Sequence, residues 1–228
     1  MTKWLASIQS LQEAQTILNN LPDILDLKDP SKGALGALTI ENVAEIVQFI
    51  DKRCLVSATI GDLPMDAQLI SKAILAMNTT AVDYIKIGLF PDSNLTQCLT
   101  ELANTVQQVN TPIIAVLFAD QHYDSEYLHL LSSSRFKGVM VDTAIKDGKS
   151  LLDHWQLTQL KNFVNTAQQH HLLCGLAGAL HQDDIPKLKL LGADYLGFRS
   201  ALCQQHIRNK NLDPILLQQV RTAIKLRV

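Results

Sequence analysis

Residues 113–143 read IIAVLFADQHYDSEYLHLLSSSRFKGVMVDT, and they contain the repeating unit from which the fold can be inferred. An apolar, β-branched run covers Ile113–Ala119, and a second covers Gly138–Thr143. Between them, Ser125–Leu131 has the spacing of a short amphipathic helix. A strand, a helix and a second strand in this order predict two parallel strands joined by a right-handed crossover.

The same unit recurs along the whole chain at intervals of about 25 to 30 residues. Amphipathic stretches lie between the apolar runs, for example Val43–Ile50, Leu157–His170 and Pro214–Leu226. The predicted strands are Leu5–Ile8, Asp23–Lys28, Cys54–Thr59, Val82–Leu89, Ile113–Ala119, Gly138–Thr143, Leu173–Gly178 and Asp194–Arg199. Eight such units favour a closed (β/α)8 TIM barrel over an open sheet. No Gly-x-Gly-x-x-Gly follows the first strand, and no linker divides the chain. We therefore predict an α/β protein with one compact domain over residues 1–228.

Composition excludes several classes of protein. With 20 Lys and Arg against 22 Asp and Glu, the net charge of −2 argues against nucleic acid as a partner. The longest apolar run is Ile113–Ala119, well short of the roughly 20 residues of a membrane helix. The four cysteines include no Cys-x-x-Cys, and the seven histidines lack zinc-ligand spacing. We expect a cytoplasmic enzyme with no metal, no cofactor and no membrane partner.

Charged residues follow the apolar runs where a barrel carries its chemistry, at the C-terminal ends of the strands. Side chains alternate along a strand, so Asp26 and Lys28 share one face, and Lys86 lies opposite two isoleucines. Any one of these charges has a common structural explanation, such as a helix cap or a solvated ion pair. Their convergence on one opening indicates a site, since burying charge is costly. The set is Asp26, Lys28, Lys86, Asp120, Asp142, Lys146 and Arg199.

Several lysines beside several carboxylates suit imine chemistry. A lysine amine attacks a carbonyl only when neutral, and burial or neighbouring cations lower its pKa. Carboxylates or a second amine can then move protons, as in a class I aldolase. The loops that contain Gly178, Arg199 and Ser200 follow the seventh and eighth strands, where barrels commonly bind phosphate. The residues alone indicate a phosphorylated carbonyl substrate and leave the imine-forming lysine open among Lys28, Lys86 and Lys146.

The motifs that contain these charges resemble a known family. The stretch 26–37, DLKDPSKGALGA, and the stretch 142–149, DTAIKDGK, are similar to signatures of the (5-formylfuran-3-yl)methyl phosphate synthases. These are also called 4-(hydroxymethyl)-2-furancarboxaldehyde-phosphate synthases. Weaker matches follow in order along the chain, and they are 56–64 (VSATIGDLP), 83–89 (DYIKIGL), 176–178 (LAG) and 192–194 (GAD).

The resemblance implies a lyase that condenses two molecules of glyceraldehyde 3-phosphate into a phosphorylated furan aldehyde for methanofuran-type C1 cofactors. It implies that Lys28 forms the Schiff base and Lys86 accepts a proton. Asp26, Asp142 and Lys146 match the family's other charged active-site positions. Asp120, Gly178, Arg199 and Ser200 are then expected to bind the substrate and its phosphate.

Three positions depart from the family pattern. Tyr123 and Gln9 stand where an arginine is expected, and Ser200 stands where a glycine commonly follows Arg199. These changes leave room for another Schiff-base aldolase or a phosphosugar isomerase on the same barrel. A catalytically silent paralogue that serves as a binding protein is a third reading. The exposed helices of such a barrel also allow a homo-oligomer.

Overall fold

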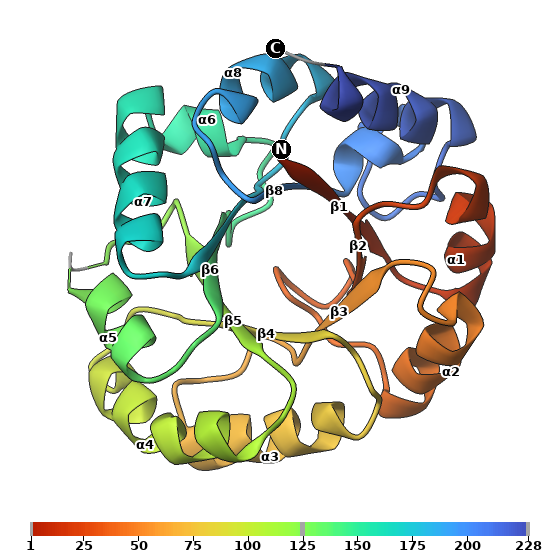
Figure 1. Cartoon of the computed structure of the whole chain (residues 1–228). Helices are drawn as coiled ribbons and strands as arrows, with labels where there is room; N and C mark the ends of the chain where they lie inside the picture. Colours follow the sequence, from red (N-terminus) through yellow and green to blue (C-terminus); the bar gives the residue numbers. More distant parts are fainter. Residues whose placement is uncertain (1, 124–125, 227–228) are drawn as a thin grey trace.

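A computed structural model describes residues 2–123 and 126–226, and it shows a closed barrel of eight parallel strands in sequence order (Figure 1). Each strand pairs with the next, and β8 returns to β1, with Leu5 opposite both Ile24 and Gly197. The fold is therefore the (β/α)8 barrel that the sequence predicts. Its strands are β1 (Lys3–Ile8), β2 (Ile24–Leu27), β3 (Leu55–Thr59), β4 (Tyr84–Gly88), β5 (Ile113–Phe118), β6 (Gly138–Asp142), β7 (Leu173–Leu176) and β8 (Tyr195–Phe198).

Helices surround the barrel, and several of them begin at a side-chain cap. Ser10, Asp66 and Asp213 each accept hydrogen bonds from the first turn of α1, α3 and α9, and Pro214 is the first residue of α9. None of the helices in the described ranges is long and apolar enough to cross a membrane. The helices are α1 (Leu11–Ile17), α2 (Ile40–Ile50), α3 (Ala67–Asn78), α4 (Leu95–Gln108), α5 (Tyr127–Ser133), α6 (Leu151–His154), α7 (Leu157–Gln169), α8 (Ile185–Lys189) and α9 (Pro214–Lys225). Short 3₁₀ turns are η1 (Leu18–Asn20), η2 (Gln182–Asp184), η3 (Ser200–Leu202) and η4 (Gln204–His206).

Several predicted boundaries of helices and strands differ from those in the structure. The helix predicted over Ser125–Leu131 begins at a residue outside the described ranges, and α5 extends to Ser133. The strands predicted to begin at Asp23 and Asp194 begin one residue later. The reason is that these aspartates lie at the N-terminal end of the barrel and accept backbone N–H groups of the preceding strands. Oδ2 of Asp23 accepts the backbone N–H of Trp4 at 2.9 Å, and Oδ2 of Asp194 accepts that of Cys174 at 2.7 Å.

The apolar core has two layers. The outer layer packs the strands against the helices, and the inner layer fills the barrel with Leu5, Ile114, Phe118, Met140 and Tyr195 among others. Charged side chains interrupt the inner layer only on some strands, so the barrel is apolar toward β5 and polar toward β2, β4 and β6. This asymmetry places the charged groups together.

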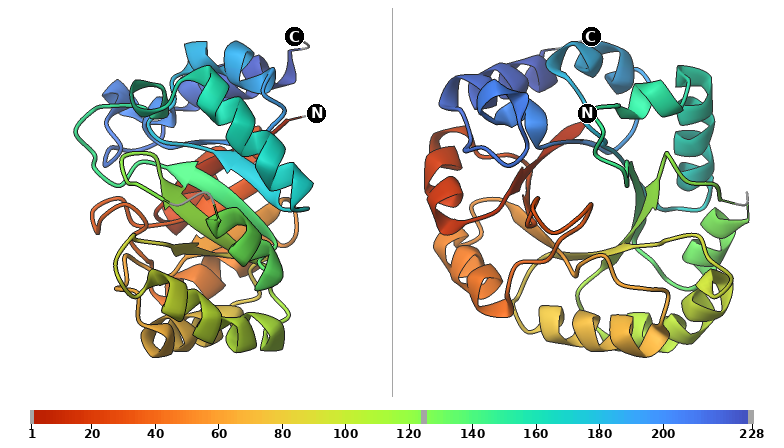
Figure 2. Two further views of the ribbon diagram at one scale, coloured as in Figure 1. Left: turned by 90° about the vertical axis from the view of Figure 1, so that its left-hand side faces the viewer. Right: turned by 180° about the vertical axis from the view of Figure 1, so that it is seen from behind.

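The long loop between β2 and α2 folds inward across one end of the barrel (Figure 1). Its Leu35 is fully buried, and its backbone N–H groups at Ala34 and Leu35 bond both carboxylate oxygens of Asp62, which follows β3. The side view shows loops gathered at the end opposite the N-terminus, where the strands finish (Figure 2). We call this end the mouth of the barrel.

Candidate active site

A cavity of about 250 Å³ opens at the mouth, and we call it the mouth cavity. Strands β1, β6 and β8 supply its walls, together with residues that follow β2, β6, β7 and β8. Most of the residues predicted from the sequence line it. These are Lys28, Asp142, Lys146, Gly178, Arg199 and Ser200, and Ser7, Lys149, His206 and Arg208 join them.

Lys28 lies directly after β2 and points its amine into the mouth cavity. Its side chain is 8% exposed, and its Nζ lies 3.6 Å from Oδ2 of Asp142. Burial lowers the pKa of Lys28 to about 8, although the carboxylates of Asp142 and Asp26 act in the opposite direction. A measurable fraction of this amine is therefore neutral near pH 7, as nucleophilic attack on a carbonyl requires.

Asp142 ends β6 between two lysines. Its Oδ1 accepts a hydrogen bond from Nζ of Lys146 at 3.0 Å and from the N–H of Thr143 at 2.7 Å. Burial acts to raise the pKa of Asp142, but the charges of Lys146 and Lys28 outweigh it and hold that pKa below its usual range. The carboxylate stays ionised and can accept or return a proton beside the Lys28 amine.

A second charged pair lies deeper in the barrel. Asp26 has no exposed surface, and its carboxylate accepts hydrogen bonds from Lys86 at 2.9 Å, Ser57 at 2.6 Å and Ser7 at 3.0 Å. Burial opposes ionisation here as well, yet Lys86 and Lys28 lower the pKa of Asp26. The Asp26 carboxylate therefore stays charged between the two lysines.

Lys86 lines a different cavity from Lys28. This second cavity, of about 130 Å³, lies at the N-terminal end of the barrel and is also lined by Tyr84 and Tyr195. Lys86 is 1% exposed and is not among the residues that line the mouth cavity. Its connection with Lys28 runs through Asp26, so the predicted group at the mouth is arranged in two levels.

Arg199 lines the mouth cavity, and its guanidinium is held by contacts within the protein. Its guanidinium forms a two-point ion pair with Glu13 of α1, at 2.6 and 3.0 Å. The remaining N–H groups donate to the carbonyl oxygens of Ser7, Arg208 and Lys210. All five guanidinium N–H groups are used within the protein, and phosphate binding by Arg199 stays a prediction.

Asp120 is also engaged by the protein, through both of its carboxylate oxygens. Its two oxygens accept the backbone N–H groups of Ala144 at 2.8 Å and Ile145 at 2.6 Å. Asp120 is absent from the lining of the mouth cavity. It fixes the loop after β6, which contains Lys146, and substrate binding by Asp120 stays a prediction.

The three residues that depart from the family pattern contact the ends of strands, the start of α1 or the mouth cavity. The Tyr123 hydroxyl donates to the carbonyl of Leu89 at 2.7 Å and accepts the N–H of Phe118, so it joins the ends of β4 and β5. Gln9 donates its backbone N–H to Glu13 at 2.9 Å. Ser200 lines the mouth cavity at the start of η3.

Gly178 is a position where the mouth requires glycine. Its φ of +109° is unfavourable for other residues, and an added Cβ would lie 3.0 Å from Cγ2 of Thr143. The backbone after β7 therefore approaches the end of β6 closely.

Three residues that the sequence analysis did not select contribute to the site. Ser7 is on the inward face of β1, two residues from Leu5, and strand alternation could have identified it. Glu13 has the position of an ordinary helix residue, and Arg208 lies in an irregular segment after η4, so no local pattern marks them.

Fold and site together define a (β/α)8 barrel with lysines and carboxylates at the C-terminal ends of its strands. The 4-HFC-P synthase family pattern matches residues 4–221, and the chain belongs to this family. The (5-formylfuran-3-yl)methyl phosphate synthase of Methanocaldococcus jannaschii is 34% identical over 232 residues, covering 97% of this chain and 99% of the relative. That of Methanopyrus kandleri is 32% identical over 216 residues, covering 90% and 91%.

Solved structures of other enzymes share the fold at low sequence identity. Phosphoribosyl anthranilate isomerase from Thermotoga maritima has a TM-score of 0.68 at 10% identity, over 99% of both chains. A 3-hexulose-6-phosphate synthase has a TM-score of 0.60 at 14% identity, over 97% of this chain and 99% of its own. These likenesses concern the barrel alone.

Proposed function

We propose that the protein is a lyase that condenses two molecules of glyceraldehyde 3-phosphate to (5-formylfuran-3-yl)methyl phosphate, with release of phosphate and water. Membership of the 4-HFC-P synthase family and the names of the relatives support the product. One structural observation carries the mechanism: the buried Lys28 amine, with a pKa of about 8, faces the mouth cavity beside Asp142.

In this mechanism the neutral amine of Lys28 attacks the aldehyde carbon of one triose phosphate. The addition product loses water and leaves an imine, and protonation of the imine draws electrons from the adjacent carbon. A base can then remove the proton from that carbon and generate the enamine for carbon–carbon bond formation. Asp142 lies 3.6 Å from the amine, and this separation supports it as the group that exchanges protons there.

Lys86 and Asp26 take part from the lower level of the site. Asp26 accepts a hydrogen bond from Lys86 and lies close enough to Lys28 for each charge to alter the other's pKa. The pair can pass a proton upward during aldol addition, cyclisation and phosphate elimination. Lys146, which bonds Asp142, adds positive charge that favours the neutral form of Lys28.

Reduction with borohydride in the presence of glyceraldehyde 3-phosphate tests the covalent step. Intact-mass measurement should show an adduct on the wild type and none on Lys28→Ala. Lys32→Ala is a matched control, because Lys32 lies on the same loop with its side chain 61% exposed, and this variant should keep the adduct. An equal adduct on Lys28→Ala would overturn the assignment of Lys28.

Ultraviolet absorbance tests the product separately, because a conjugated furan aldehyde absorbs strongly and a simple aldol does not. An adduct on Lys28 without the furan absorbance would favour another Schiff-base aldolase or a phosphosugar isomerase. Absence of both would favour the binding protein considered above.

A further inference from the structure

Every N–H of Arg199 is engaged within the protein, whereas a second arginine of the mouth cavity, Arg208, has donors available for a ligand. Arg208 lines the mouth cavity together with Lys28 and Asp142, and it is half-buried. Within the described residues its side chain donates one hydrogen bond, from Nη2 to the carbonyl oxygen of Gly33 at 3.1 Å. A guanidinium has five N–H donors, so Arg208 has donors to spare for a ligand in the cavity.

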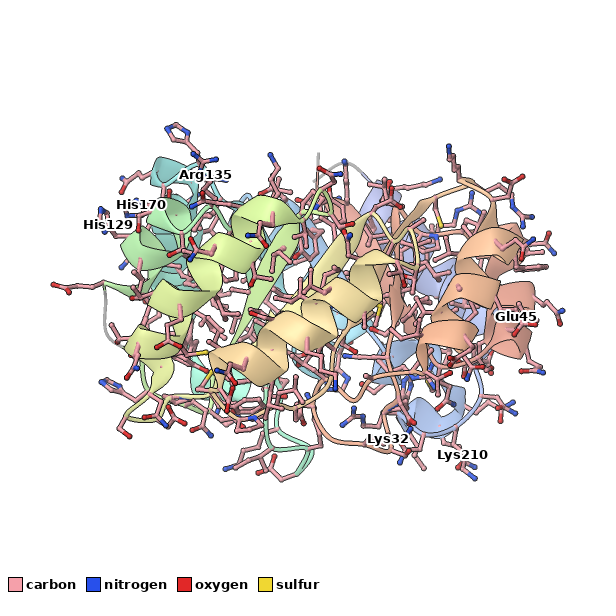
Figure 3. All side chains as sticks on the ribbon, turned by 90° about the horizontal axis from the view of Figure 1, so that it is seen from below. Lys32, Glu45, His129, Arg135, His170 and Lys210 are labelled. Atoms are coloured by element: carbon pink, nitrogen blue, oxygen red, sulfur yellow. The ribbon has the colours of Figure 1, made fainter. Side chains whose placement is uncertain are left out.

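Arg208 is also held above the imine-forming lysine. Gly33, which accepts its hydrogen bond, belongs to the loop that begins directly after Lys28 and folds across the mouth. Figure 3 shows Lys32, which precedes Gly33, and Lys210, two residues after Arg208, on one face of the molecule, with Arg135 on the opposite face. The guanidinium therefore bridges the β2 loop and the segment after β8.

The segment that presents Arg208 is fixed by Arg199. Cys203 and Leu212 form an isolated antiparallel bridge, which closes residues 203–212 into a loop. Within this loop, Nε of Arg199 donates to the carbonyl of Arg208 at 2.8 Å, and Nη2 donates to that of Lys210 at 3.2 Å. Glu13 in turn holds Arg199 through a pair in which both side chains are 6% exposed.

We propose that Arg208 binds the phosphate group of the substrate, and that Arg199 and Glu13 are positioning residues that hold the Arg208 backbone. The ligand class is a phosphate monoester on a short carbon chain, because a planar guanidinium pairs with phosphate through two parallel N–H donors. A three-carbon aldehyde attached to Lys28 would carry its phosphate only a few bonds from the amine. The choice of substrate rests on the proposed function, but the binding of a phosphate monoester does not.

Calorimetric titration with glycerol 3-phosphate tests this site without any chemistry, because that compound lacks a carbonyl and cannot form an imine. Arg208→Gln should weaken binding roughly 10- to 100-fold, as expected for lost hydrogen bonds to a charged group. The affinity of Arg208→Lys for glycerol 3-phosphate should fall between those of the wild type and Arg208→Gln. Arg135→Gln removes the same charge from the opposite face and should bind as the wild type does. Binding to Arg208→Gln within twofold of the wild type would refute the proposal.

A double-mutant cycle separates the contributions of Arg199 and Arg208 to the binding of glycerol 3-phosphate. If Arg199 acts only through Arg208, Arg199→Gln should weaken binding in the wild type and cause little further loss when Arg208→Gln is already present. Additive losses would show that Arg199 contacts the phosphate directly, and would contradict its positioning role. Thermal melting identifies folded variants, and Glu13→Gln replaces Arg199→Gln in the cycle if the latter does not fold.

The outcome of these binding measurements does not depend on which reaction the enzyme performs. If the wild type makes no furan but Arg208→Gln loses glycerol 3-phosphate, the proposed function fails and the phosphate site stands. If furan forms and Arg208→Gln still binds normally, the opposite holds.

Discussion

Replacement of Asp142 by Asn tests the electrostatic account of Lys28. In the wild type, burial lowers the pKa of Lys28 to about 8, and Asp142 is the largest influence in the other direction. Removing that carboxylate should therefore lower the pKa further. Lys146 adds to this effect, because it loses its carboxylate partner and its positive charge then acts on Lys28 without compensation.

The size of the change follows from the 3.6 Å separation between Nζ of Lys28 and Oδ2 of Asp142. Coulomb's law gives about 1 kcal/mol for this pair in a water-like medium and roughly 4 to 5 kcal/mol at an effective dielectric constant near 20. At about 1.4 kcal/mol per pKa unit, the expected decrease is roughly one to three units. The fraction of neutral amine at pH 7 would rise from about a tenth to at least half.

Trace acetylation with acetic anhydride measures this directly. The rate of labelling at Lys28, followed by peptide mass spectrometry against an added lysine peptide, reports the neutral fraction at each pH. Its midpoint should be near 8 in the wild type and lower in Asp142→Asn. Asp147→Asn, an exposed carboxylate on the same loop, should leave the midpoint unchanged.

Two results would refute the reasoning. A wild-type midpoint at or above 10 would mean that burial does not control the amine, and a higher midpoint in Asp142→Asn would mean that the sign of the interaction is wrong. Furan formation should nevertheless fall in Asp142→Asn, because the same carboxylate is proposed to move protons. A more reactive amine with lower turnover is the expected combination.

Three further outcomes follow from the contacts around the site. Asp120→Asn should lower kcat roughly 10- to 100-fold by misplacing Lys146, since an amide can accept only one of the two backbone N–H groups; unchanged kcat would contradict the anchoring role. Glu13→Ala leaves the buried guanidinium of Arg199 without its ion-pair partner, which should cost about 3 to 5 kcal/mol and lower Tm by roughly 6 to 20 °C in differential scanning calorimetry. Tyr123→Phe leaves two backbone groups without their partner and should cost about 1 to 3 kcal/mol in urea unfolding, whereas a cost near zero would mean that water replaces the hydroxyl.

The barrel and the group around Asp142 could be predicted because both depend on regular spacing. Strand periodicity identified eight units, and parallel strands bring their C-terminal ends to one side. Lys28, Asp142 and Lys146 each follow or end a strand, so their meeting required no knowledge of the loops. Lys86 lies in the middle of β4, and its depth below Lys28 depends on strand stagger, which alternation alone does not reveal.

The contacts of Arg199 and Asp120 could not be predicted, because their partners lie in irregular segments or far away in sequence. Arg199 is paired with Glu13, 186 residues away, and with carbonyl oxygens of a segment that has no periodic pattern. Asp120 bonds backbone groups 24 and 25 residues further along. In both cases the residue was placed correctly near the mouth, and only the three-dimensional contacts show that its polar atoms are engaged by the protein.

The two aspartates that follow β3 and β5 have a consequence for how this barrel can be altered. Asp62 holds the loop that begins with Lys28 directly after β2, and Asp120 holds the loop of Lys146 after β6. In each case the support comes from the neighbouring strand and not from the strand that bears the lysine. Transplanting a single strand with its own loop into another barrel would therefore leave the lysine without its support. The smallest transferable part is a pair of adjacent strands, β2 with β3 or β5 with β6, and recombination between barrels should respect these pairs.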